Sequence, residues 1–395
     1  MEPLNLHFNF RDIFRSPRLA LSGKKIWTFI VANFVAYVIY FILNYIALSL
    51  SGQSFNETWN TQGIYPCLYL LGGPWFAWAL FWTSILFWIF TIQLASTAVA
   101  RITYKQLKGD DFFSANDGWR YVKKHWHPII FSPISLILIL FLFLAISALF
   151  ALIGKIPYLG EFIFALPYPV YFFGSMFTIY TGIVLVISFL YSPAIVATME
   201  EDTMGAVFNS YAITWSQPWR IITYYAILIP IATIGVTTLK IFSFYSIKLI
   251  NTIFSHYILM GSKLTNIFGS AADIVWPKEL FLSISTGLTT CSLLCGNSCN
   301  LSVHLNVFYS RFIPSAPQSI SGSEYFATIF LSIFLFILTL SFLSYMLSIL
   351  SVGNTLMFSI YRMRSDNDNI LTHKDEDELE EEKIDDNPIT KTDDI

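Results

Sequence analysis

The sequence predicts an all-α, polytopic transmembrane helix bundle of about six spans, with amphipathic helices lying along its cytoplasmic face. Only 12% of the 395 residues are charged, whereas a soluble domain usually has about 25%. Aromatic residues make up 17% of the chain, as expected for lipid-facing surfaces with interfacial anchors. Several apolar runs also reach the roughly 20 residues needed to cross a hydrocarbon layer about 30 Å thick.

Six apolar runs meet this length requirement. Two of them, 166–198 and 325–360, are long enough to be tilted, broken or extended beyond the lipid. The predicted spans are about 26–50, 74–100, 129–154, 166–198, 221–242 and 325–360. They define a transmembrane domain over 26–362, which follows a basic amphipathic arm at 1–25. We expect the acidic tail at 363–395 to be disordered, because a polar segment of like charge cannot bury enough surface to offset its ordering entropy.

The distribution of Lys and Arg predicts how the chain is threaded. The N-terminal arm carries five of these residues and the segment 101–128 carries six, whereas the link 51–73 carries none. By the positive-inside rule, both termini and the loops after the second and fourth spans are therefore cytoplasmic.

One stretch, 243–324, stays open at this stage. Ile247, Ile250 and Ile253 recur at helical spacing, which indicates an interfacial helix. The segment 282–309 fits another span, a re-entrant pair or a second interfacial helix. If both termini lie inside, any extra crossings here must be even in number.

Each of the two larger cytoplasmic loops is expected to contain one short amphipathic helix. In the first, Ser114 and Asp117 have the spacing of a capping box. In the second, Asp202 precedes a group of residues expected to share one apolar face. These are Met204, Val207, Phe208, Tyr211 and Trp215. In both loops an amphipathic helix follows one span, and a Trp and then a Pro precede the next span. This common order is either a weak internal repeat or the ordinary appearance of interfacial loops.

The N-terminal arm has the same mixed character as these loops. It interleaves apolar and basic residues, which suits a helix lying on an anionic leaflet, and Pro17 is expected to divide it. The candidate contacts with the membrane surface or a partner are Arg11, Arg15, Arg18, Arg120, Lys123, Lys124, Val207, Phe208, Tyr211 and Trp215.

No motif in the sequence identifies a reaction. It contains no P-loop, no His-Glu-x-x-His zinc motif and no Gly-x-Ser-x-Gly nucleophile elbow. His125 and His127 stand two residues apart and would point apart on a helix, so we interpret them as interfacial side chains. Cys291, Cys295 and Cys299 could line one helical face as soft-metal ligands, but small buried cysteines are the commoner meaning. We expect no catalytic residue, no metal and no cofactor.

The predicted spans contain no ionisable residue near the bilayer centre. Such residues mark ion paths and proton relays, so their absence counts against a transporter that couples protons or sodium through a carboxylate. The polar residues of the spans are Asn33, Asn44, Gln93 and Asn354. We expect these amides to bridge neighbouring helices.

A family resemblance rests on five short segments. Residues 192–196 (Ser-Pro-Ala-Ile-Val) are followed by an acidic group at 200–202 and by Ala206 and Ser210, with similar features at 156–160 and 360–364. The pattern resembles uncharacterised bacterial multi-pass proteins of the YciC-like and DUF975-like groups, and the membrane domain of some glycerophosphodiester phosphodiesterases. The soluble phosphodiesterase domain is missing, so the resemblance implies a bacterial inner-membrane location and no activity.

Three functions remain as hypotheses. The first is a non-enzymatic membrane protein that organises lipid or docks a partner, and the second is a transporter or permease subunit whose helix near 202–215 contacts a cytoplasmic ATPase. The third is an intramembrane lipid-acting enzyme, which ranks last because the spans offer no recognisable acid, base, metal or nucleophile. The expected partners are the lipid bilayer, anionic lipids and a cytoplasmic or membrane protein, with no nucleic acid.

Overall fold

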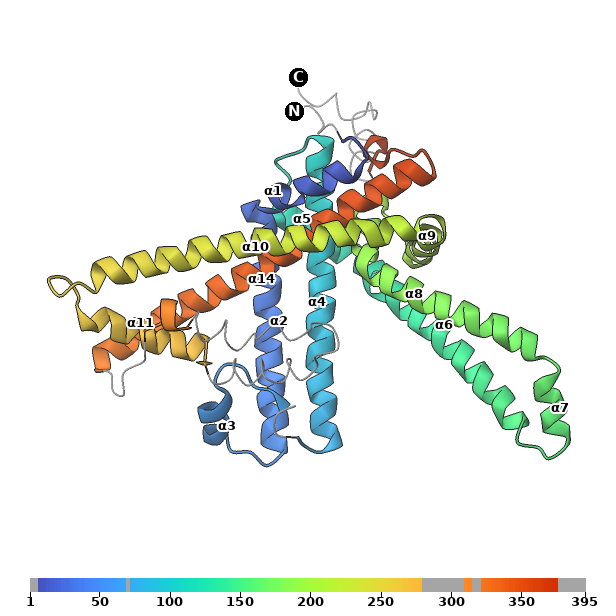
Figure 1. Cartoon of the computed structure of the whole chain (residues 1–395), viewed down its shortest axis with the longest axis horizontal. Helices are drawn as coiled ribbons and strands as arrows, with labels where there is room; N and C mark the ends of the chain where they lie inside the picture. The colour runs from blue at the N-terminus through green and yellow to red at the C-terminus, as the bar shows by residue number, and fades with distance from the viewer. Residues whose placement is uncertain (1–5, 69–71, 279–308, 315–320, 376–395) are drawn as a thin grey trace, which may run out of the picture. The chain divides into compact units, whose positions relative to one another are not determined.

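The computed structural model describes residues 6–68, 72–278, 309–314 and 321–375. Within these ranges every regular element is helical (Figure 1). Six helices are long and apolar enough to cross a membrane, which confirms the predicted fold class. They are α2 (Gly23–Leu50), α4 (Trp75–Lys108), α6 (Trp126–Ile153), α8 (Tyr168–Met199), α10 (Pro218–Phe254) and α14 (Gly322–Ser365).

Short helices lie before, between and after these six. They are η1 (Phe10–Arg15), α1 (Ser16–Ala20), α3 (Phe55–Gln62), α5 (Ala115–Lys124), α7 (Leu159–Ala165), α9 (Thr203–Ser216), α11 (Ser262–Val275) and η3 (Ile370–Thr372). The two expected loop helices are thus present as α5 and α9. The N-terminal arm is divided as expected, since Pro17 is the second residue of α1 and η1 ends at Arg15.

Three of the long helices continue past the predicted spans. Helix α4 extends to Lys108 and α14 to Ser365, in both cases through basic residues at the C-terminal end. Helix α10 runs on to Phe254, so the interfacial helix expected around Ile250 is a continuation of α10. No proline lies between Pro230 and Phe254, so none interrupts the helix before its end. Cys291, Cys295 and Cys299, with most of 282–309, lie outside the described residues.

The chain forms two compact units. Unit 1 comprises Met1–Phe29, Ile92–Ala232 and Leu347–Ile395, and unit 2 comprises Ile30–Thr91 and Thr233–Met346. The boundaries fall inside α2, α4, α10 and α14, so each of these four helices contributes residues to both units.

In unit 1, α6 and α8 run side by side and are joined through α7 (Figure 1). Helix α9 packs against both of them, and its Val207 forms an apolar cluster with Leu136 and Val184. Helices α10 and α14 approach closely at Gly353, where an added Cβ would lie 2.6 Å from a methyl group of Leu228. A glycine therefore permits this contact between two long helices.

In unit 2, α11 packs against α14 through a cluster that includes Phe268, Val275 and Leu335. Trp276, at the end of α11, donates its indole N–H to Thr339 at 2.9 Å. The small residues Ala271 and Ala272 are fully buried in the same cluster and allow this close approach.

The four amides of the spans bridge neighbouring helices, as expected. The Asn33 side chain donates to Ser344 at 3.3 Å, and that of Asn44 donates to Ser84 at 3.0 Å. The other two reach backbone carbonyls of α8, because Gln93 donates to Phe189 at 2.8 Å and Asn354 donates to Leu190 at 2.9 Å. An amide held in this way is a helix-packing contact.

The first residues of the expected disordered tail are placed in the structure. After α14, the segment 366–375 contains η3, buries Ile370 completely and ends at the buried side chain of Asp375. Contacts with basic residues explain this difference, since they provide the stabilisation that the polar sequence itself lacks. Residues 376–395 lie outside the described residues.

Candidate functional site: a cation cluster at the end of α4

The last two turns of α4 carry three cations on one face. Arg101, Lys105 and Lys108 follow a spacing of four and then three residues, which places them on the same side of a helix. The Arg101 side chain is fully buried, and those of Lys105 and Lys108 are 9% and 13% exposed. We call these three residues the α4 cation cluster. Buried cations need ionic or hydrogen-bonding partners, because desolvating a charge is otherwise costly.

Arg101 is held in position by residues at the end of α8. Its guanidinium pairs with Glu200 at 2.8 Å and donates to the carbonyl oxygen of Ala197 at 3.1 Å. It also lies over the ring of Tyr121, 4.4 Å from the centroid, and the Tyr121 hydroxyl donates to the Val196 carbonyl at 2.6 Å. Helices α4, α5 and α8 are therefore joined at this point, and the cation–π contact adds to the ion pair.

All three cations converge on a single carboxylate, that of Asp375. Its Oδ2 lies 3.3 Å from Arg101 and 2.6 Å from Lys105, and its Oδ1 lies 3.4 Å from Lys108. The Tyr104 hydroxyl donates to the same Oδ1 at 3.0 Å. One acidic side chain near the end of the described chain is thus contacted by four groups of α4.

The charge state of Asp375 follows from its surroundings. Burial alone would raise its pKa, but Arg101, Lys105 and Lys108 favour the ionised form and bring the pKa below the ordinary value. The carboxylate is therefore ionised at neutral pH, and its contacts with the cluster are charge-assisted.

The segment 366–375 is also held by two further kinds of contact. Arg362, in the last turn of α14, forms ion pairs with Asp366 and, at 2.9 Å, with Asp368. Backbone carbonyls of the segment accept from α4: Ile370 from the Tyr104 hydroxyl at 3.0 Å and His373 from Lys108 at 2.7 Å. We call residues 366–375 the docked segment.

The N-terminal arm meets the same region of unit 1. Lys24 donates to the carbonyl oxygens of Asp111 at 2.8 Å and Phe113 at 3.0 Å, both in the link between α4 and α5. The Arg364 side chain donates to the carbonyl oxygen of Phe8 at 3.3 Å. The arm, the link between α4 and α5, the link between α8 and α9, which contains Glu200, and the docked segment therefore lie at one end of unit 1. The charge rule assigns these same four segments to one side of the membrane.

The basic candidates from the sequence have different environments. Arg11 and Arg18 are exposed, whereas Arg15 is partly buried and lies 3.6 Å from Asp12. On α5, Lys123 and Lys124 are exposed, and Arg120 is 82% exposed with Asp117 at 3.3 Å. The α5 cations thus form an accessible basic face.

The expected single apolar face of α9 is split between the interior and the surface. Val207 is buried, and Tyr211 is partly buried with its hydroxyl donating to Thr181 at 3.1 Å. Phe208 and Trp215 are 68% and 80% exposed. The buried face also includes small residues such as Ala206 and Ser210, which a search for large apolar side chains overlooks.

Sequence reasoning missed the α4 cation cluster and its carboxylate. The three cations were visible only as part of a charge count, although their helical spacing indicated a shared face. The adjacent Ile370 and Leu371, in a strongly acidic tail, were the signal for a docked segment. Neither signal identifies Asp375 as the partner.

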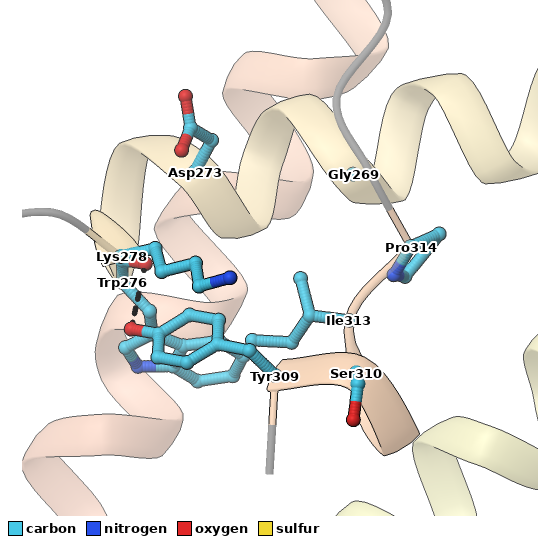
Figure 2. Close-up of a pocket in the computed structure, with 8 residues that line it drawn as sticks. All are labelled: Gly269, Asp273, Trp276, Lys278, Tyr309, Ser310, Ile313 and Pro314. Carbon is cyan, nitrogen blue, oxygen red and sulfur yellow. Dashed lines mark hydrogen bonds between the residues drawn. The ribbon is translucent and has the colours of Figure 1, made fainter. Parts of the chain in front are cut away.

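A second feature is a cavity of about 490 Å³ in unit 2 (Figure 2). Its wall includes Asp273 and Trp276 near the end of α11, Lys278 just beyond it, and Tyr309, whose hydroxyl donates to the Trp276 carbonyl at 3.0 Å. Burial and the nearby Asp273 raise the pKa of Tyr309 to about 12, so this phenol is neutral and acts as a hydrogen-bond donor.

Among the residues that the structure describes, no group of three His, Cys, Asp or Glu side chains could hold a metal ion.

No protein-family model matches this chain, and no curated protein and no solved structure shows significant similarity to it.

Proposed function

We propose that this protein is a non-enzymatic, multi-pass protein of the bacterial plasma membrane, with both termini in the cytoplasm, which binds anionic lipid or docks a partner at its cytoplasmic face. The observation that carries this proposal is the accessible basic face of α5. Arg120, Lys123 and Lys124 are all exposed, and α5 lies in the unit where the four segments assigned to the cytoplasm meet.

The physical basis is electrostatic attraction to an anionic leaflet. Each Lys or Arg near such a surface contributes about 1 kcal/mol. Three such residues together give about 3 kcal/mol, or roughly a hundredfold in affinity. The exposed aromatic residues of α9, Phe208 and Trp215, support the same role, since aromatic side chains are favoured at the membrane interface.

The experiment is charge reversal of α5 in the full-length protein, reconstituted in nanodiscs of neutral lipid. The combined variant Arg120→Glu, Lys123→Glu and Lys124→Glu should weaken association with anionic vesicles by at least about a hundredfold in a flotation assay, because it removes three attractive charges and adds three repulsive ones. Lys155→Glu is the control, because Lys155 follows the opposite end of α6 from Lys124. Unchanged association of the combined variant would contradict the proposal.

A transporter or permease subunit working with a cytoplasmic ATPase is the second candidate function. It is favoured by the exposed Phe208 and Trp215, which stand on a short helix between two spans. An ATPase should then co-purify with the protein, and Phe208→Asp should abolish this co-purification. Phe112→Asp is the control and should retain it, because Phe112 is also exposed (88%) but lies in the link between α4 and α5. Purification without such a partner, together with no flux in liposomes, would exclude this candidate.

A further inference from the structure

Asp375 places an anionic group at the centre of four donors on α4. Two of its features resemble a ligand more than a structural residue. It is contacted by two lysines, an arginine and a tyrosine hydroxyl, all on α4, within 2.6 to 3.4 Å. It also comes from a different part of the chain, more than 260 residues from these donors in sequence.

The arginine of the donor set does not depend on Asp375 for its position. Arg101 is held by Glu200, by the Ala197 carbonyl and by the ring of Tyr121. Lys105 and Lys108 extend from consecutive turns of the same helix. Positioned cations and hydroxyl donors of this kind bind phosphate oxygens strongly, and arginine suits them best because of its planar fork.

We propose that the α4 cation cluster is a binding site for a phosphate monoester, and that Asp375 occupies the position of that phosphate group in the present structure. A phosphate monoester carries a charge of about −1.5 to −2 and three acceptor oxygens. It therefore offers more acceptors to the four donors than a carboxylate does. The inference rests on the proposed role of the cytoplasmic face, and it names the ligand class that this face recognises.

The docked segment can leave without unfolding the helices. Its ion pairs at Asp366 and Asp368 are made with Arg362 of α14, next to it in sequence. Its contacts with α4 include the Asp375 carboxylate and two backbone carbonyls, and its Ile370 side chain is buried. Ligand and docked segment compete for one site, so the apparent affinity depends on the fraction of molecules in which the segment has left.

The experiment measures hydrogen exchange of the peptide 366–375 in the full-length protein, in nanodiscs. Phenyl phosphate added to nanodiscs of neutral phosphatidylcholine tests a soluble monoester. Phosphatidic acid, compared with phosphatidylserine at equal mole fraction, tests a lipid headgroup, because only the first is a phosphate monoester. Faster exchange with phenyl phosphate or with phosphatidic acid supports the proposal and identifies the source. No change with either, or an equal change with phosphatidylserine, would overturn it.

Variants test whether Asp375 is the competitor. Asp375→Asn should strengthen phenyl phosphate binding about tenfold by removing the competing charge. Glu161→Gln, which alters a carboxylate on α7 and outside the docked segment, should leave the affinity unchanged. Lys105→Gln should weaken binding about tenfold while keeping a long polar side chain. Equal affinity of Asp375→Asn and the unaltered protein would also overturn the proposal.

The two proposals can fail separately. Phenyl phosphate binding involves the buried cations of α4, and vesicle association involves the exposed cations of α5. A protein that keeps one property and loses the other on the corresponding substitution distinguishes them.

Discussion

Helices α5 and α9 occupy equivalent places in the chain, each between two spans, but they meet their surroundings in opposite ways. Helix α5 packs on α4 through Gly118 and through the Tyr121 ring, which lies under Arg101, and it exposes cations. Helix α9 packs on α6 and α8 through the apolar Val207, and it exposes Phe208 and Trp215. The difference indicates that α5 suits electrostatic attraction to an anionic surface, whereas α9 suits insertion among apolar groups of lipid or protein.

The largest expected effect concerns the two glycines of these helices. A Cβ at Gly118 would lie 3.2 Å from the Ala98 carbonyl oxygen and from the Ile102 side chain, so Gly118→Val should cost about 1–3 kcal/mol through overpacking. At Gly205 the nearest atoms belong to the Glu201 side chain, which can move away. Gly205→Val is therefore the matched control, and thermal unfolding in detergent measures both. Equal melting temperatures would show that α5 is not tightly packed on α4.

The next effect concerns the apolar seat of α9. Val207→Ala removes two methyl groups from the cluster with Leu136 and Val184, and should cost about 1–2 kcal/mol. Phe208→Ala should change stability by less than about 0.5 kcal/mol, because the side chain is mostly exposed. Thermal unfolding again provides the measurement. A larger loss from Phe208→Ala would mean that the outer face of α9 is covered in the folded protein.

The two helix starts provide a smaller contrast. Ser114 accepts from the Asp117 N–H at 3.3 Å while Asp117 accepts from the Ser114 N–H at 3.1 Å, which forms a reciprocal capping box. Asp202 accepts from the Gly205 N–H at 2.7 Å. Ser114→Ala and Asp202→Ala should each cost about 1 kcal/mol, with the greater loss at Ser114 because its hydroxyl also holds the Asp117 carboxylate. Hydrogen exchange at the first turn of each helix measures the effect.

The smallest effect is a dependence on pH at the start of α5. Hydrogen bonding from the Ser114 hydroxyl lowers the pKa of Asp117 below its ordinary value of 3.8, against a smaller opposing effect of burial. The ionised cap therefore stabilises α5 fully above pH 3.8, and this contribution is lost as the pH falls through the lowered value. Exchange at the start of α5, normalised to an unfolded peptide, should increase below about pH 4. Asp117→Asn should abolish that increase, and an increase that persists would assign it to another group.

The spans were predictable because their signal is local. Runs of about 20 apolar residues identify each helix without knowledge of its neighbours. The ends were less predictable, because continuations such as Lys105–Lys108 and Ile250–Phe254 have ordinary amphipathic composition. The burial of Val207 in the predicted contact face of α9 was not foreseen, because the neighbouring helices decide which residues of α9 are covered.

The candidate site was not predictable for a different reason. Arg101, Glu200 and Asp375 are far apart in sequence, and nothing local to any of them specifies the other two. The acidic composition of the tail argued for solvation and disorder. Only the contacts with α4 show that one carboxylate of the tail, that of Asp375, is buried.

The contact between Arg101 and Asp375 also has a consequence for biosynthesis. The two residues are 375 − 101 = 274 positions apart, and translation adds about 5–20 residues per second. Helix α4 is therefore made roughly 14–55 seconds before the carboxylate that contacts it exists. During that interval Glu200, which is synthesised first, is the acidic residue that pairs with Arg101. The contact with Asp375 can form only after residue 375 is synthesised. Closure of this end of unit 1 is thus a late step in the maturation of the protein.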